Sequence, residues 1–163
     1  MRLLLLAALC CAPARAEEAQ TEAPPRALGV GVNDLGGQLD YDFGRGHRLE
    51  LRYLTGKEDS DEGRIATSVI GMRVYQRFRI QGIYHPYVGA EASFVQAKIA
   101  GGAYSVNGAA PGLFVGVDRD LGKRFSMGLD IGPYLFILHE RSTNTRGTSF
   151  DVIANAFLLF HVY

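Results

Sequence analysis

The amino-acid sequence predicts an all-β fold, a closed antiparallel up-and-down barrel of eight strands. Apolar and polar residues alternate with a period of two from Ala27 onward, which is the pattern of strands that have one apolar face. No segment of any length has a convincing helical period, and glycine is frequent, with 20 residues. Short turns and longer polar loops join the segments in alternation, an asymmetry typical of barrels that cross a membrane.

The first sixteen residues, MRLLLLAALCCAPARA, have the form of a secretory signal peptide. Arg2 precedes an unbroken apolar run from Leu3 to Ala12, and the small-residue cleavage motif Ala14-Arg15-Ala16 follows. The mature chain is therefore expected to begin near Glu17. Both cysteines leave with the signal peptide, so no disulfide is expected in the exported domain.

Two further regions complete the predicted organisation. Residues 17–26, EEAQTEAPPR, are acidic and contain two prolines, and they are expected to form a short disordered lead-in. Residues 27–163 are expected to form one domain, the barrel, because the exported part has only about 147 residues.

Charge and hydropathy argue against a nucleic-acid partner and against a membrane-spanning helix. The chain has 17 basic and 17 acidic residues, and removal of Arg2 and Arg15 leaves a net charge of about −2. This near balance gives no electrostatic reason to expect a nucleic-acid partner. No run after the signal peptide approaches the ~18 to 20 apolar residues of a membrane-spanning helix, so a membrane span has to be made of strands.

Each strand and each connection is predicted from the alternation. The predicted strands are 27–33, 36–43, 47–55, 64–78, 87–97, 111–121, 125–139 and 149–163. A turn at Asn33-Asp34 separates the first two; a single strand over 28–43 is the alternative and would give seven strands. Tight turns are expected at Gly44-Arg45-Gly46 and Gly122-Lys123-Arg124, and long loops at 56–63, 98–110 and 140–148. Pro133 removes a backbone donor inside a strand, so a bulge or irregularity is expected there.

Alternation alone leaves open which face of the sheet is exposed to water. In segment 47–55, for example, Leu49, Leu51 and Tyr53 share one face, and Arg48, Glu50 and Arg52 share the other. A soluble exported barrel such as a lipocalin has the same period with its apolar face inward.

Three features favour an apolar exterior in contact with lipid. Lysine occurs only at Lys57, Lys98 and Lys123, all in predicted connections, whereas a water-covered sheet normally carries lysine. The charged face has residues of both signs that could pair across a narrow lumen, and aromatic residues gather near the short-turn end, as at a membrane interface. The predicted lumen charge network is Asp40, Asp42, Arg48, Glu50, Arg52, Arg73, Arg77, Glu91, Asp118 and Asp130, and the predicted aromatic girdle is Phe43, Phe78, Tyr84, Tyr87, Phe125, Phe160 and Tyr163.

Residues 27–163 resemble the small eight-stranded outer-membrane proteins of Gram-negative bacteria, the OmpA/OmpX-type and opacity-type barrels. The resemblance lies in HPYVGAEASF (85–94), in GVDRDLGKRFSMGLDIG (116–132) and in a last strand that ends with Tyr163. His161 departs from the family pattern, which usually has an aromatic or apolar residue at that near-terminal position.

The resemblance implies an outer-membrane location and a monomer in contact with outer-membrane lipids and lipopolysaccharide. It also implies recognition of the C-terminal strand by the outer-membrane assembly machinery. A structural or surface-interaction role is expected, with paired charges plugging the lumen and no open channel, because eight strands leave room only for side chains.

The stretch LHERSTNTRGTSFD, residues 138–151, suggests an alternative function. It resembles the late His-x-Ser-Asn motif of PagL-type lipid A deacylases, with His139, Ser142 and Asp151 as a possible triad. Here three positions separate histidine and serine instead of two, and strand parity places His139 on the outward row and Asp151 on the inward one. A polar loop is therefore favoured; the acyl hydrolase is a second hypothesis, and a soluble ligand-binding barrel a third.

Two short motifs suggest ligands but lack the complete pattern. KEDSDEG (57–63) contains an acidic D-x-D-like fragment, without the further oxygen ligands of a calcium loop. GVGVNDLG (29–36) lacks the third glycine and the following helix of a nucleotide-binding loop, and is expected to be a strand and a turn. The sequence thus predicts no metal site and no cofactor.

Overall fold

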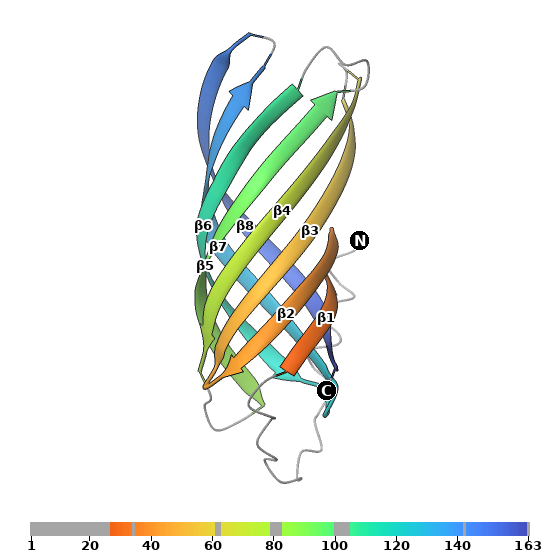
Figure 1. Ribbon diagram of the computed structural model, residues 1–163, viewed down its shortest axis with the longest axis vertical. Coiled ribbons are helices and arrows are strands. Elements are labelled where there is room, and N and C mark those ends of the chain that lie inside the picture. Colours follow the sequence, from red (N-terminus) through yellow and green to blue (C-terminus); the bar gives the residue numbers. More distant parts are fainter. Residues whose placement is uncertain are drawn as a thin grey trace.

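The protein is a closed eight-stranded antiparallel barrel in the computed structural model, which describes residues 27–33, 35–60, 63–78, 83–99, 105–141 and 143–162. Neighbours in the chain are neighbours in the sheet, and β1 closes the ring by pairing with β8 (Figure 1). The predicted fold class is confirmed. The strands are β1 (Ala27–Asn33), β2 (Gly36–Gly44), β3 (His47–Ser60), β4 (Gly63–Arg77), β5 (Tyr84–Ile99), β6 (Ser105–Asp120), β7 (Phe125–Glu140) and β8 (Thr145–Val162).

The connections differ in length at the two ends of the barrel. At one end, β2 passes to β3 through Arg45 and Gly46, which have φ angles of 57° and 83°, as tight hairpin turns require. At the other end, the predicted long loops are largely strand. Residues 56–60 extend β3, 105–110 extend β6, and β7 and β8 approach each other until Glu140 pairs with Thr145.

The three predicted loop boundaries are therefore wrong. Strand prediction relied on outward apolar residues, and these become sparse in 56–63, 98–110 and 140–148. Backbone pairing does not need them: the ladder of β3 and β4 continues to Ser60 opposite Gly63.

The first hairpin is much shorter than the other three. β1 and β2 have seven and nine residues, against 18 in β8, and they end well below the tips of the other strands (Figure 1). The amide of Thr55 donates to the carbonyl oxygen of Leu35 at 3.0 Å and holds the tip against β3. Above this tip, within the described residues, 56–60 of β3 and 145–156 of β8 pair on one side only.

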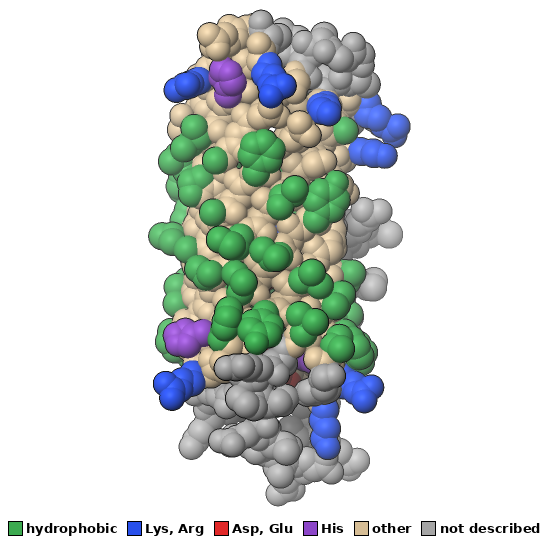
Figure 2. Space-filling view, in the orientation of Figure 1, with side chains coloured by type: hydrophobic (Ala, Val, Ile, Leu, Met, Phe, Trp, Pro, Cys, Tyr) green, Lys and Arg blue, Asp and Glu red, His purple; other side chains and the backbone are tan. Residues whose placement is uncertain are grey.

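Polar and apolar side chains have exchanged the places they take in a soluble protein. Leu39, Leu51 and Ile131 point outward and are about half exposed, at 49%, 49% and 51%. Their inward neighbours are charged and buried, with Asp40 at 2% and Glu50 at 1% exposure. Figure 2 shows hydrophobic side chains over the middle of one face, with lysine and arginine near both ends. The charged face is therefore the inner one.

Glycines on the inner face make room for large side chains. A Cβ atom at Gly116 would lie 2.3 Å from the ring of Tyr87, and one at Gly112 would lie 2.4 Å from the ring of Tyr134. A buried apolar cluster lies among the charges and is formed by Tyr75, Tyr87, Phe114, Phe157 and Leu159. Large side chains set against glycines fill the narrow interior of the barrel.

The irregularity predicted at Pro133 is present as an interrupted ladder rather than a bulge. β7 keeps its register with β8 through Pro133, which lies opposite Val152. On the β6 side, pairing stops after Gly112 opposite Tyr134 and resumes at Val115 opposite Ile131 with the register unchanged. The two strands approach closely here, because a Cβ at Gly132 would lie 1.8 Å from the carbonyl oxygen of Leu113.

We expect Gly132→Ala to lower the free energy of unfolding by about 1–3 kcal/mol, because the new methyl group would overlap a neighbouring backbone that cannot move freely. Gly147→Ala is the control, since a Cβ there meets no atom within 4 Å. Urea unfolding of both variants in lipid vesicles measures the difference. Equal stability of the two variants would contradict the close approach of β6 and β7.

The lumen charge network as candidate functional site

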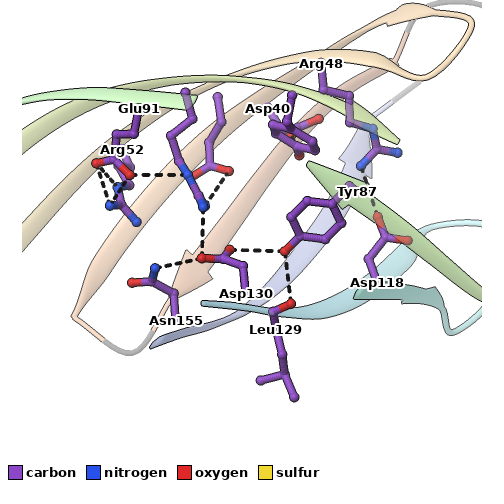
Figure 3. A network of polar contacts seen from close by, with 12 residues as sticks. Asp40, Arg48, Arg52, Tyr87, Glu91, Asp118, Leu129, Asp130 and Asn155 are labelled. Carbon is purple, nitrogen blue, oxygen red and sulfur yellow. Dashed lines mark hydrogen bonds and ion pairs between the residues drawn. The ribbon is translucent and has the colours of Figure 1, made fainter. Parts of the chain in front are cut away.

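The ten charged residues of the predicted lumen network all lie inside the barrel and are 1–9% exposed. They comprise four arginines and six carboxylates, carried by the six consecutive strands from β2 to β7. Each lies on the inward phase of its strand, and Figure 3 shows how several of these side chains point toward one another across the lumen.

Two arginines and two aspartates form a cluster near the short-turn end. Arg48 Nε donates to Asp42 Oδ2 at 3.2 Å, and Arg48 Nη1 lies 3.8 Å from Asp118 Oδ2. Arg77 Nη2 lies 2.7 Å from Asp118 Oδ1 and 2.9 Å from Asp120 at the rim. Asp118 thus joins two arginines that come from different strands.

Arg73 lies at the centre of the network and reaches carboxylates of three other strands. Its guanidinium lies 2.9 Å from Asp130, 3.4 Å from Glu50 and 3.4 Å from Glu91. The same guanidinium lies 3.6 Å above the centre of the Phe114 ring, in the geometry of a cation–π contact. Arg73 therefore ties β3, β5 and β7 to β4.

Glu91 accepts hydrogen bonds from several donors on the upper side of the network. Arg52 Nε donates to it at 3.0 Å, and Arg52 Nη2 binds both of its oxygens. Tyr134 donates its hydroxyl at 2.7 Å, and the Ser93 hydroxyl is also bonded to it. A bidentate arginine and two hydroxyl donors satisfy this buried carboxylate.

Sequence reasoning missed the neutral members of the network. Tyr75 donates to Asp40 at 2.5 Å, and Asn155 Nδ2 donates to Asp130 at 2.8 Å. The sequence did indicate that Tyr75 faces inward, because it lies on the same face of its strand as Arg73 and Arg77. Asn155 is the only strongly polar residue on the inward row of β8 between 153 and 159, and an apolar sequence context concealed it.

The girdle prediction is wrong for Tyr87. This side chain is 3% exposed, and its hydroxyl donates to Asp130 at 3.1 Å inside the lumen. Tyr87 shares the inward phase of Glu91, so strand parity excludes it from the outer surface. Phe43, Phe78, Tyr84, Phe125 and Phe160 are exposed, and Tyr163 lies outside the described residues.

The structure separates the two described residues of the possible triad. His139 pairs with Arg146, whereas Asp151 pairs with Tyr134, five positions further along β7. That offset corresponds to about 17 Å along the strands. Asp151 is exposed and accepts a hydrogen bond from the amide of Val152. Ser142 lies outside the described residues, and the histidine and the acid cannot act on it together in this arrangement.

The two short motifs that suggested ligands, at 29–36 and 57–63, form no ligand site within the described residues. Residues 29–33 of GVGVNDLG lie in β1 and Gly36 begins β2, so this segment is a strand and a turn. Lys57 is exposed on β3, and the side chains of residues 58–63 lie outside the described set. In the described part of the chain, no group of three histidine, cysteine or acidic side chains could hold a metal ion, and no helix could span a membrane.

Comparison with known proteins leaves the family open. No family model matches the chain, and no curated protein matches it. Among solved structures, the chain is similar to CarO of Acinetobacter baumannii, with 13% sequence identity over 85% of this chain and 96% of that one, and a TM-score of 0.35. A similarity at that TM-score carries no argument about fold or function.

We expect Arg73→Met to destabilise the barrel by about 3–5 kcal/mol, because three buried carboxylates would lose their common cation. Arg146→Met, at an exposed position on β8, should change stability by less than about 1 kcal/mol. Denaturant titrations in the same lipid vesicles test this contrast. Similar losses in both variants would show that Arg73 does not neutralise a buried cluster.

Proposed function

We propose that the chain is a small integral outer-membrane β-barrel with a structural or surface-interaction role, whose lumen is plugged by its charge network. The distribution of side chains carries this proposal. Large apolar residues are exposed on the outside of every strand, while paired charges are buried inside. Such a surface suits lipid and not water, because an apolar exterior this extensive would associate in solution.

The height of the outer apolar band agrees with a bilayer. On β7 the outward row runs from Phe125 to Ile137, with Leu129, Ile131 and Leu135 exposed between them. Thirteen residues at ~3.3 Å each and a tilt of ~40° span about 30 Å. At the lower edge Phe125 and Phe160 lie 5.1 Å apart between ring centres, as in the aromatic belts of membrane interfaces.

The interior supports a plugged barrel rather than a channel. Guanidinium groups and carboxylates from non-adjacent strands are in contact across the lumen, and the aromatic cluster packs against inner glycines. Ion passage would require these pairs to separate inside a region of low dielectric, which is costly.

The upper ends of the strands offer a surface for partners. At the upper edge of the apolar band and above it the outward residues are polar, as at Arg64, Lys98, Asn107 and Thr148. Such side chains suit contact with lipopolysaccharide head groups or other envelope components. We infer that the protein is a monomer, since the closed ring leaves the lower half of the barrel without a strand edge.

The assembly machinery is the other expected partner, through β8. The departure at His161 does not interrupt the outward row of this strand, because His161 faces inward and its Nε2 lies 3.0 Å from Ser126 Oγ. Phe160 and Val162 remain exposed on the outer face. An apolar outer row at the end of the last strand is therefore available for recognition.

We expect Ile131→Arg to cost about 2–4 kcal/mol of stability in lipid vesicles, because it places a cation at the middle of the apolar band. Thr148→Arg, on the outward row of β8 at the upper edge of the band opposite Ile137, should cost less than about 1 kcal/mol. Reversible unfolding from vesicles measures both. The lipid-facing role of the outer band would be refuted if the two substitutions were equally harmless.

Localisation and closure can be tested on the unmodified full chain. Expressed in a Gram-negative host, it should fractionate with the outer membrane and migrate differently on gels before and after boiling. In planar bilayers the purified barrel should give no stable conductance steps. Recovery in the soluble periplasmic fraction would contradict the membrane proposal, and regular conductance steps would contradict the plugged lumen.

A further inference from the structure

The inner face of the barrel changes character along its axis. Below the tip of the first hairpin it carries the charge network, whereas above this tip most inward side chains of β4 to β7 are apolar, and Thr67 on β4 and Ser149 and Asp151 on β8 are polar. The apolar part of the upper inner face includes Leu54 on β3, Val69 on β4, Val95 on β5, Val106 on β6, and Phe136 and Leu138 on β7. We call these six residues the apolar wall. The outer face changes in the opposite sense, toward polar residues such as Lys98 and Asn107.

Strand register brings the residues of the apolar wall onto neighbouring strands. Leu54 lies opposite Val69, and Val69 lies opposite Val95. Gly108 then lies opposite both Val95 and Leu138, so the middle of the wall carries no side chain. Val69, Val106, Phe136 and Leu138 are only partly buried, whereas the inner charges below them are buried. Part of this apolar surface is therefore uncovered.

The barrel is open at the side of the apolar wall. Because β1 and β2 end early, residues 56–60 of β3 and 145–156 of β8 have no neighbour on one side within the described chain. At this height β8 still presents Phe150 and Val152 outward, 68% and 54% exposed. Phe150 pairs with Leu135 of the outer band, so the side opening reaches the level of the lipid.

A buried donor lies at the lower end of the opening. Gln38 is an inward side chain of the first hairpin, is 5% exposed, and lies below Asn33 at the tip. Within the described residues, neither Gln38 Nε2 nor Asn33 Nδ2 has a hydrogen-bond partner. A buried amide donor without an acceptor is costly.

We propose that the apolar wall binds an acyl chain of a membrane lipid that enters sideways between β3 and β8. This inference rests on the proposed membrane location. A sheet face of valine, leucine and phenylalanine has no hydrogen-bonding groups to offer, and an aliphatic chain needs none. A peptide strand would instead pair along one of the two free edges. A lipid chain reaches the wall without leaving the hydrocarbon layer, because the opening and the outer band share the same height.

Tryptophan fluorescence can locate the lipid chain, because the natural chain has no tryptophan. We would place single tryptophans at Phe136→Trp on the apolar wall and at its outward neighbour Leu135→Trp. Ile153→Trp and Val152→Trp form a second inward and outward pair on β8, in case one variant does not fold. The full chain is refolded in vesicles of phosphatidylcholine whose acyl chains are brominated at the middle, and in vesicles of the unbrominated lipid. Iodide in the buffer probes access to water.

The expected result is that brominated chains quench tryptophan at position 136 nearly as strongly as at position 135, while iodide quenches both weakly. Strong quenching at 136 by iodide, without quenching by bromine, would show a water-filled vestibule and overturn the proposal. Protection at 136 from both quenchers would show that protein covers the wall and would also overturn it. Absence of bromine quenching at 135 would contradict the membrane barrel itself, so the two failures are distinguishable.

The lipid proposal also predicts that quenching by brominated chains depends on the apolar character of the wall. In the Phe136→Trp background, Leu138→Asp should reduce quenching by brominated chains and increase quenching by iodide, because a carboxylate would draw water to the wall. Glu140→Gln in the same background is the control, since it alters charge on the same inward row beyond the wall. Unchanged quenching in the Leu138→Asp variant, with the folded gel mobility retained, would contradict acyl-chain binding at the wall.

Discussion

The neutralisation of buried charge around Arg73 is the interaction on which the rest of the structure depends. Its guanidinium contacts carboxylates from β3, β5 and β7, so a single side chain links four of the eight strands. A carboxylate left alone in the lumen would have neither water nor a counter-charge. Because the charges pair inside, the outer face is free to be apolar throughout the band, and the barrel can face lipid without exposing a charge.

The backbone obeys the same constraint as the side chains. In a bilayer, every amide and carbonyl group has to be paired within the protein, and a closed sheet achieves this. β1 performs the closure by pairing with β2 on one side and β8 on the other. Above the tip of the first hairpin the closure ends and the free edges of β3 and β8 begin. The change of the inner face of β4 to β7 from charged to mainly apolar begins at that height, so the proposed lipid site lies where the closure ends.

Much of this arrangement could be predicted from the sequence, because strand parity is a local property. The phase of Glu50 against Leu49 and Leu51 assigns the inner face of β3, and the same reasoning placed every charged member of the network. Parity also separates His139 from Asp151, and the register of β7 and β8 agrees with that separation. Tyr87 was misplaced because position near a turn was given more weight than its phase relative to Glu91.

Other features depended on contacts between distant strands. The hydrogen bonds of Tyr75 and Tyr134 to carboxylates join positions 35 and 43 residues apart, and no local pattern reveals such partners. The upper strand ends at 56–60, 105–110 and 145–148 were missed because their outward residues are polar or small; the inward Val106, for example, alternates with the outward Ser105 and Asn107, a weak pattern when an apolar outer face is expected. The apolar wall follows from this reversed pattern only when the register is known.

Accessibility along β7 tests the central claim most directly, namely that apolar residues face lipid while charges face a closed lumen. Both natural cysteines lie at positions 10 and 11, so single cysteines from 125 to 137 can each carry a spin label in vesicles. Collision with oxygen should be high at outward positions such as 129 and 131 and low at inward positions such as 130, with little collision at either with a water-soluble nickel chelate. High nickel accessibility at the outward positions, or no period of two, would contradict a lipid-facing barrel with a closed interior.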